Sequence, residues 1–263
     1  MSTTTLIGSF LRFLLALALA AAALPALAQP ADTIARVKAS VVAVGTVQRL
    51  RTPQLQFRGT GFAVGDGTLI ATNAHVIGAR PLAAGDDPEV LAIAIPSDNP
   101  QKAQVRVVQR AREDSERDLA LLRMPGTPLP ALALRDSGNV REGEQFLLTG
   151  FPIGSVLGLY AATHRAMIAA VTPIAIPMND ARKLDTAMVL RLQGGAFTVF
   201  QLDATSYPGN SGSPIYDPAT GEVVGVLNMV FVKGTKEKAL TDPSGISYAI
   251  PSRYLQALIA ASR

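Results

Sequence analysis

A serine enclosed by glycines stands in the run Pro208-Gly209-Asn210-Ser211-Gly212-Ser213-Pro214. Glycine has no Cβ, so such a loop reaches dihedral angles closed to other residues and can turn its N–H groups inward. Inward N–H groups stabilise the negative oxygen that forms when a hydroxyl attacks a carbonyl. We therefore predict Ser211 as a nucleophile. The backbone of Gly209, Asn210 and Ser211, above all the N–H groups of Gly209 and Ser211, would stabilise the oxyanion.

A serine hydroxyl is a weak nucleophile at neutral pH, so it needs a base and a group that orients the base. The chain has two histidines and no cysteine. His75 follows an apolar stretch, in Thr72-Asn73-Ala74-His75-Val76, whereas His164 stands beside Arg165 with no carboxylate near it in sequence. We predict His75 as the base. His164 is read as a surface or loop histidine and stays the lesser alternative.

The acid that orients the base is sought among the aspartates. Asp118 opens the apolar run Asp118-Leu119-Ala120-Leu121-Leu122, where a carboxylate is costly as an unpaired charge and useful as an acceptor for an imidazole N–H. Asp114 is the rival, but its neighbours Glu113, Ser115, Glu116 and Arg117 indicate a solvated loop. An ordinary aspartate at the start of a strand is the alternative reading of Asp118.

The order His75, Asp118, Ser211 is that of chymotrypsin, not of subtilisin or the α/β-hydrolases. The chain resembles the trypsin-like serine peptidases of the HtrA type. The blocks that carry this resemblance are Gly59-Thr60-Gly61-Phe62, Thr72 to Val76, Asp118 to Leu122 and Gly209 to Pro214. Weaker matches are Ala39 to Val42, Arg141 to Glu144, Gly150 to Gly154 and Ser247 to Pro251.

The resemblance implies an all-β fold: two six-stranded antiparallel β-barrels of the chymotrypsin type, with the active site between them and a C-terminal helix. It implies a serine endopeptidase with protein or peptide substrates and with no cofactor or metal. Homo-oligomers, common in that family, are left open because no segment shows what would join subunits. The PDZ domains of that family are not expected, since the chain ends at Arg263, shortly after Pro251.

Short segments rich in β-branched and apolar residues recur along the chain, which is typical of strands. Gly65-Asp66-Gly67 between two of them indicates a hairpin that delivers His75 to the end of a sheet. The link 125–130 separates an N-terminal barrel of about residues 40–125 from a C-terminal barrel of about residues 140–251. Strands are predicted at 41–47, 57–64, 68–72, 90–95, 105–109, 119–123, 145–149, 166–171, 197–202, 222–232 and 246–250, helices at 32–39 and 252–262, and a mobile loop at 173–195.

Residues 1–28 read as a leader. Leu14 to Leu24 is an apolar run, and Ala26-Leu27-Ala28 is a small-x-small cleavage pattern. Residues 29–263 then form the folded domain, in the periplasm or outside the cell. Retention of the leader as an N-terminal anchor is the alternative; with cleavage, no stable membrane insertion is expected.

Composition excludes several classes of protein. Without cysteine, stability does not rest on disulfides, and neither thiol catalysis nor a closed zinc site of the usual ligands can be built. The formal net charge is a mild +4, with basic residues scattered and partly answered by acidic ones. No basic helix or aromatic-basic platform is visible, so nucleic-acid binding is not expected.

Substrate preference is read from two positions. Counting back from Ser211, the position that carries an aspartate in trypsin holds Thr205, which argues against cleavage after Arg or Lys. The strand Gly225 to Val230 resembles the pocket wall of HtrA proteins and lacks the histidine that glutamyl endopeptidases carry there. We expect small or medium apolar residues before the cut, with Ser206, Leu227 and Met229 lining the pocket.

Two other classes of function stay open from the sequence. The first is a catalytically silent peptide-binding or chaperone-like protein on a peptidase fold. The second is a membrane-tethered structural protein, which depends on retention of the leader. The presence of His75, Asp118, Ser211 and the glycine at 209 counts against the first.

Overall fold

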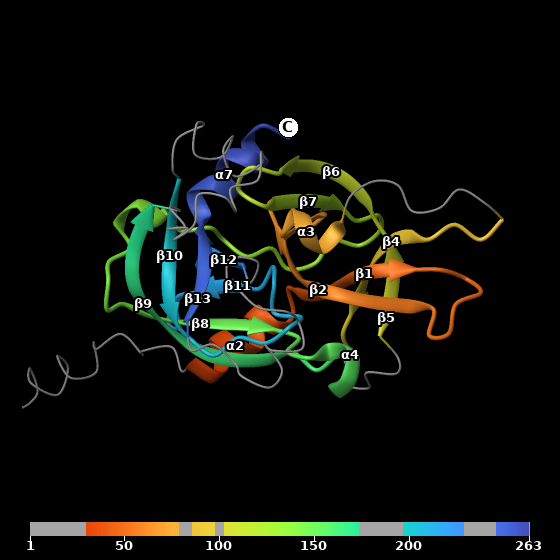
Figure 1. The fold of residues 1–263 in the computed structure, drawn as a ribbon, viewed down its shortest axis with the longest axis horizontal. Helices are drawn as coiled ribbons and strands as arrows, with labels where there is room; N and C mark the ends of the chain where they lie inside the picture. The colour runs from red at the N-terminus through yellow and green to blue at the C-terminus, as the bar shows by residue number, and fades with distance from the viewer. Residues whose placement is uncertain (1–29, 79–85, 98–102, 174–196, 229–245, 263) are drawn as a thin grey trace, which may run out of the picture.

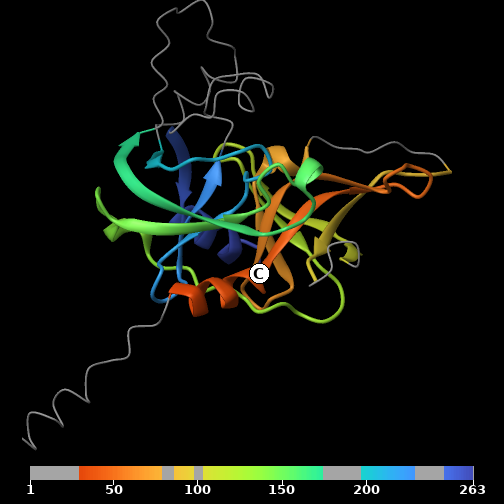
Figure 2. The ribbon, with the colours of Figure 1, turned by 90° about the horizontal axis from the view of Figure 1, so that it is seen from below.

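The computed structural model describes residues 30–78, 86–97, 103–173, 197–228 and 246–262 of the 263-residue chain. Within these residues the chain forms antiparallel strands in two groups that lie side by side (Figure 1, Figure 2). The predicted all-β fold is confirmed. The predicted leader, and the predicted loop after Pro173, lie outside the described residues.

The N-terminal half is a seven-stranded sheet in the order β5-β4-β1-β2-β3-β7-β6. The predicted hairpin is confirmed, because β2 pairs with β3 across Gly65-Asp66-Gly67. The elements of this half are α2 (Pro30–Lys38), β1 (Val41–Val47), β2 (Leu55–Val64), β3 (Leu69–Thr72), α3 (Ala74–Ile77), β4 (Val90–Ile95), β5 (Gln104–Val107), β6 (Gln109–Asp114) and β7 (Leu119–Arg123).

The two end strands of this sheet are consecutive in the chain and are separated by Val108 alone. β5 pairs with β4, and β6 pairs with β7. The N–H of Val108 donates to the Leu91 carbonyl at 3.0 Å, so the strand bends there without losing its pairing. The predicted strand 105–109 therefore falls partly in β5 and partly in β6, at opposite ends of the sheet. The six strands predicted for this half thus become seven. The solvated loop predicted around Asp114 is confirmed for residues 115–117, which form a turn, but not for Glu113, which lies in the exposed strand β6.

The C-terminal half is a closed six-stranded barrel in the order β10-β13-β12-β11-β8-β9, as predicted. Its short strand β11 was not predicted, because it directly follows the glycine-bracketed serine loop. The elements of this half are η2 (Ser137–Asn139), β8 (Gln145–Gly150), α4 (Gly154–Leu157), β9 (Ala162–Pro173), β10 (Thr198–Asp203), β11 (Pro214–Tyr216), β12 (Val223–Asn228), β13 (Ile246–Pro251) and α7 (Ser252–Ala260).

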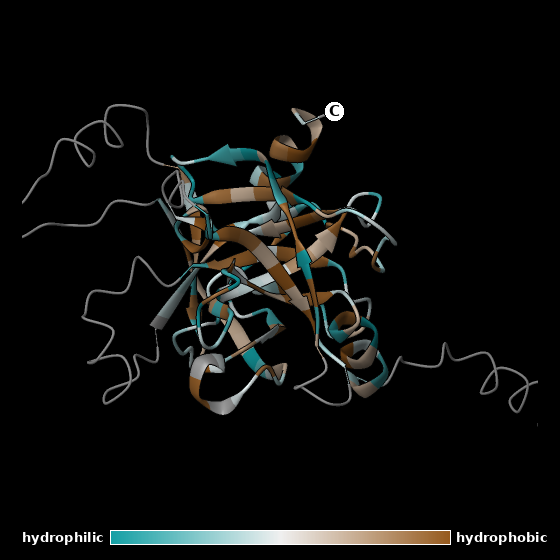
Figure 3. Ribbon diagram, turned by 90° about the vertical axis from the view of Figure 1, so that its right-hand side faces the viewer, coloured by the Kyte–Doolittle hydropathy of each residue, from teal (hydrophilic) through white to brown (hydrophobic). Residues whose placement is uncertain are grey.

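The central strands β1 and β12 are buried along nearly their whole length. Figure 3 shows hydrophobic strands in the middle of the molecule beside more hydrophilic ones. In β1, Val42 and Val44 belong to a core cluster inside the N-terminal sheet, whereas Val41 and Ala43 face a second cluster. This second cluster joins the halves, because it also contains Tyr216 and other residues of the C-terminal barrel. A third cluster fills that barrel. The shared cluster fixes the position of one half against the other, and the candidate site lies at their junction.

Helices are short and lie at the margins of the sheets. α2 packs through the buried residues Thr33 and Val37, and α7 packs through Leu255 and Leu258. None of the helices that the structure describes is both long enough and apolar enough to cross a membrane.

Candidate active site

His75 lies on the single helical turn α3, which begins directly after β3. Strand β3 pairs with β7 so that Thr72 lies opposite Ala120, which brings Asp118 beside the start of the turn. The carbonyl oxygen of Asp118 accepts the N–H of Ala74 at 3.2 Å and the side-chain amide of Asn73 at 3.0 Å. The turn that carries the imidazole is therefore fixed to the residue that carries the carboxylate.

The carboxylate of Asp118 contacts the imidazole directly. Nδ1 of His75 lies 2.6 Å from Oδ2 of Asp118, and the backbone N–H of His75 donates to Oδ1 at 2.8 Å. Since an ionised carboxylate only accepts, the bond assigns the proton to Nδ1 and leaves Nε2 as the basic nitrogen. The side chain of Asp118 is only 13% exposed, against 33% for His75, so the acid lies behind the base.

A third donor completes the shell of this carboxylate. The side-chain amide of Asn228, at the end of β12, donates to Oδ2 of Asp118 at 2.7 Å. Asn228 is fully buried and belongs to the other half of the molecule. No role for Asn228 was predicted from the sequence. The feature that could have indicated one is a polar residue at the end of the otherwise apolar strand Val223–Asn228.

The serine loop and the α3 turn both approach strand β2 at Gly59. A Cβ added to Gly59 would lie 2.7 Å from Val76, the neighbour of His75, and 3.0 Å from the carbonyl oxygen of Ser211. Glycine at this position therefore lets the α3 turn and the serine loop approach the strand together. In the next residue, the N–H of Thr60 donates to the Ser211 carbonyl at 2.8 Å.

Two peptide groups of the serine loop are hydrogen-bonded through both their carbonyl and their N–H. Between residues 209 and 210, the Gly209 carbonyl accepts from the Thr60 hydroxyl and the Asn210 N–H donates to the Tyr207 carbonyl. Between residues 211 and 212, the Ser211 carbonyl accepts from the Thr60 N–H and the Gly212 N–H donates to the Leu227 carbonyl. Both ends of these two peptide groups have partners.

The other two peptide groups are bonded at one end only. The Pro208 carbonyl accepts the N–H of Ile153 at 2.7 Å, and the Asn210 carbonyl accepts the N–H of Ser213 at 3.0 Å. In a trans peptide the N–H points away from the carbonyl. The N–H groups of Gly209 and Ser211 therefore point away from these partners, and neither donates a hydrogen bond to a described residue. They are the two donors that the sequence analysis emphasised, whereas the N–H of Asn210 is engaged with Tyr207.

Gly209 has φ of 101°, a conformation that L residues with a side chain rarely adopt. A Cβ there would overlap the carbonyl oxygen of Phe151 and lie 2.8 Å from the ring of Phe57. Only glycine fits this position of the loop.

The hydroxyl of Ser211 makes no hydrogen bond with any part of the chain that the structure describes, so the structure joins His75 to Asp118 but not His75 to Ser211. Ser211 is nearly buried, with 7% of its surface exposed. In proteins without bound substrate such a contact is commonly long, and it tightens when substrate binds.

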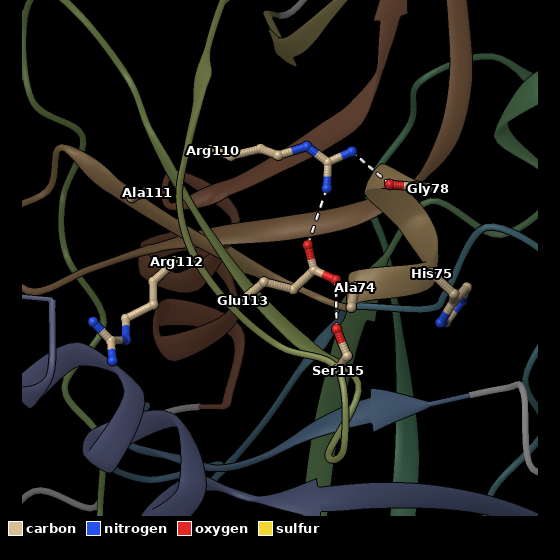
Figure 4. A pocket seen from close by; sticks show the side chains of 8 residues that line it. All are labelled: Ala74, His75, Gly78, Arg110, Ala111, Arg112, Glu113 and Ser115. Atoms are coloured by element: carbon tan, nitrogen blue, oxygen red, sulfur yellow. Dashed lines mark hydrogen bonds and ion pairs between the residues drawn. The ribbon is translucent and has the colours of Figure 1, made fainter. Parts of the chain in front are cut away.

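Asp114, the rival acid, lies apart from this arrangement. Its carboxylate accepts the backbone N–H of Arg117 at 3.0 Å and pairs with the Arg117 guanidinium at 2.9 Å. His75 also borders a pocket of about 570 Å³ along β6. Figure 4 shows Glu113 in that pocket, bonded to Arg110 on one side and Ser115 on the other, with Arg112 pointing away.

The sequence predicted His164 as a surface or loop residue. In the structure it lies half-buried in strand β9, opposite Leu148 of β8. Its ring packs 6.4 Å from that of Tyr207, and its Nε2 is buried without a hydrogen-bond partner. Burial lowers the pKa of His164. It makes no contact with Asp118, whose imidazole partner is His75.

The residues predicted to line a specificity pocket are placed in part. Ser206 is 4% exposed, and its hydroxyl bonds to that of Ser247. Leu227 is fully buried in the core cluster of the C-terminal barrel, so it has no exposed surface in this structure. Met229 lies outside the described residues.

Residues 59–226 match the family model described as "Trypsin-like peptidase domain". Among curated proteins, the chain is 32% identical over 199 residues to "Serine protease HTRA2, mitochondrial" of Bos taurus. It is 25% identical over 201 residues to "Probable periplasmic serine endoprotease DegP-like" of Marinomonas sp. (strain MWYL1). These matches cover 75% and 76% of this chain. The chain spans 34% of the length of either relative.

Among solved structures, "HtrA-type protease AlgW with tripeptide" superposes with a TM-score of 0.62 at 22% sequence identity. The match covers 89% of this chain and 63% of that chain. At this level of identity the match bears on the fold, and it agrees with the two groups of antiparallel strands described above.

Replacing His164 by glutamine should reduce the loss of stability in acid. Because the pKa of His164 is lower in the folded chain than its ordinary value of 6.5, the unfolded chain binds more protons as pH falls through that value, which lowers the free energy of unfolding. Urea denaturation at pH 7.5, 6.5 and 5.5, as rough sampling points about that value, measures the slope. Equal slopes for His164→Gln and the wild type would contradict the assignment.

Proposed function

Because the chain belongs to the family of trypsin-like peptidase domains, we propose that it is a serine endopeptidase that hydrolyses peptide bonds of proteins. Ser211 is the nucleophile, His75 the general base and acid, and Asp118 the group that orients and stabilises the imidazole. The observation that carries the proposal is the His75–Asp118 bond of 2.6 Å, beside a serine loop in which the N–H groups of Gly209 and Ser211 are free.

In the first half of the reaction the Ser211 hydroxyl attacks the carbonyl carbon of the substrate, and Nε2 of His75 takes the hydroxyl proton. The C–N bond of the tetrahedral intermediate then breaks as the imidazolium gives that proton to the leaving amine. This leaves an acyl ester on Ser211. Water, deprotonated by the same nitrogen, attacks the ester and releases the carboxylic acid and the free serine.

The role of Asp118 follows from its surroundings. Its carboxylate accepts from the His75 ring, the His75 backbone and the Asn228 amide. These donors hold the carboxylate in place, so the positive imidazolium that forms during attack has a hydrogen-bond acceptor at 2.6 Å. Asn228 is a neutral donor, which orients the carboxylate without competing as a second positive charge.

The oxyanion would be held by the free N–H groups of Gly209 and Ser211. Their orientation is set before substrate arrives, because the carbonyls of Pro208 and Asn210 are already engaged. Donors fixed in advance require no reorganisation during the reaction, and each is worth about 10²- to 10³-fold in rate in serine peptidases. No cofactor takes part in these steps.

We place the enzyme outside the cytoplasm, in the periplasm or secreted, after removal of residues 1–28, and we propose residues 29–263 as the mature chain. The support is the leader pattern that ends in Ala26-Leu27-Ala28. The mass of the N-terminal peptide of protein expressed with its leader tests this. A chain that still begins at Met1 would support the anchor instead.

Replacing Ser211 by alanine should abolish peptide hydrolysis, with a fall in kcat of about 10⁴- to 10⁶-fold, because the nucleophile is lost while binding remains. The measurement is digestion of casein and peptides by purified residues 29–263, beside labelling with a fluorophosphonate probe. The control is Ser40→Ala, which removes a buried serine hydroxyl that has no hydrogen-bond partner among the described residues. Hydrolysis or labelling that survives in Ser211→Ala would contradict the mechanism. A well-folded wild type that neither cleaves nor labels would favour a silent peptide-binding protein.

Cleavage should follow small or medium apolar residues. Thr205 offers no negative charge at the position where trypsin carries its aspartate, and the buried Ser206 is already hydrogen-bonded to Ser247. Met229 is proposed as a further lining residue together with Leu227, whose burial requires a movement before it can contact substrate. A peptide-library profile measures the preference. Cleavage dominated by Arg, Lys or Glu before the cut would contradict it.

A further inference from the structure

Thr60 takes no part in the chemical steps above. It belongs to the other half of the molecule, yet it forms two hydrogen bonds with the serine loop. It is a fully buried residue of β2, in the run Gly59-Thr60-Gly61-Phe62. Its hydroxyl lies 2.7 Å from the carbonyl oxygen of Gly209, and its N–H lies 2.8 Å from that of Ser211. One residue therefore holds two carbonyls of the loop.

These two carbonyls belong to the same residues that carry the free N–H groups. Holding the carbonyl of Gly209 fixes the peptide group that follows it, and holding the carbonyl of Ser211 does the same one residue later. The carbonyls of Pro208 and Asn210, which share a peptide group with the two free N–H groups, are also engaged. Each free N–H therefore belongs to a peptide group held through its own carbonyl, and the next peptide group is held by Thr60. The direction of both N–H groups depends on Thr60 from one side.

The direction of the Thr60 hydroxyl proton is itself determined. The N–H of Phe151 donates to Oγ1 of Thr60 at 3.2 Å, so this oxygen acts as acceptor there. A hydroxyl has one proton to give. Of the two contacts made by Oγ1, only the Gly209 carbonyl can receive it.

The backbone of the loop lies close against Thr60. A Cβ on Gly212 would overlap the carbonyl oxygen of Thr60, and a Cβ on Gly150, in β8, would lie 3.0 Å from its hydroxyl. The Thr60 carbonyl also accepts the hydroxyl of Thr72 at 2.7 Å, which fixes the strand itself three residues before His75. Thr60 is thus held by both halves at the point where they meet.

We propose that Thr60 is a positioning residue that holds Gly209 and Ser211 from across the junction of the two halves and thereby directs their N–H groups to the oxyanion. The proposal rests on the proposed peptidase function and extends it. It assigns to the N-terminal half, through a residue other than His75 and Asp118, part of the stabilisation of the transition state.

The test uses Thr60→Val, which keeps the shape of the side chain and the backbone N–H but removes the hydroxyl. We expect kcat for peptide hydrolysis to fall about 10- to 100-fold with KM changed less than about threefold, because oxyanion donors act mainly in the transition state. Thr60→Ser restores a hydroxyl and should recover most of this loss. Thr149→Val is the matched control, since Thr149 is equally buried and bonds to the hydroxyls of Thr163 and Tyr216, not to the loop.

A second readout does not depend on catalysis. Hydrogen exchange of peptides that cover residues 205–215 should be faster in Thr60→Val than in the wild type, Thr60→Ser and Thr149→Val. If the wild type neither hydrolyses nor labels but the exchange changes as expected, the peptidase function fails, and Thr60 holds the loop without serving an oxyanion. If the wild type is active and Thr60→Val keeps both its kcat within twofold and its exchange, the role of Thr60 is overturned. A Thr60→Ser variant as slow as Thr60→Val would also overturn it.

Discussion

Buried backbone N–H and carbonyl groups need hydrogen-bond partners. The candidate site depends on two N–H groups of the serine loop that have none among the described residues. Of the four peptide groups from Pro208 to Gly212, two are bonded at both ends and two only through their carbonyls. The N–H groups left over are those of Gly209 and Ser211. Their freedom does not come from disorder, because the four carbonyls from Pro208 to Ser211 are all engaged. The loop therefore keeps two donors that no described residue satisfies.

The partners that fix this loop come from both halves of the molecule. Thr60 belongs to β2 in the N-terminal sheet, and Ile153 follows β8 in the C-terminal barrel. The acid is held in the same way, since Asp118 lies in the first half and Asn228 in the second. These bonds keep their lengths only if the halves do not shift, and the apolar cluster shared between them, with Phe62 on one side and Tyr216 on the other, resists such a shift.

The sequence pointed to candidate residues for the chemistry and to most of the strands, but not to Thr60 and Asn228, which hold those candidates in place. Ser211 was recognisable from its glycines, and His75 because the chain has only two histidines. Thr60 and Asn228 make their contacts over separations of 149 and 110 residues along the chain, and no local pattern shows which distant groups they meet. His164 was misread because its neighbour Arg165 is exposed while its own ring is turned toward Tyr207. Local pattern tells which residues are unusual; the tertiary fold decides which of them meet.

Backbone strain is found at the same place. Among the described residues, the two that are not glycine and have positive φ are Asp118, at 54°, and Ile153, at 49°. The left-handed conformation costs about 1–2 kcal/mol for an L residue, and a β-branched side chain tolerates it poorly. At Asp118 the carboxylate and the carbonyl are both held by the α3 turn. At Ile153 the conformation directs the N–H to the Pro208 carbonyl, so a relaxed Ile153 would withdraw its donor and let the Gly209 peptide rotate. The conformation of Ile153 and the bond from the Thr60 hydroxyl therefore hold the two carbonyls on either side of the Gly209 N–H.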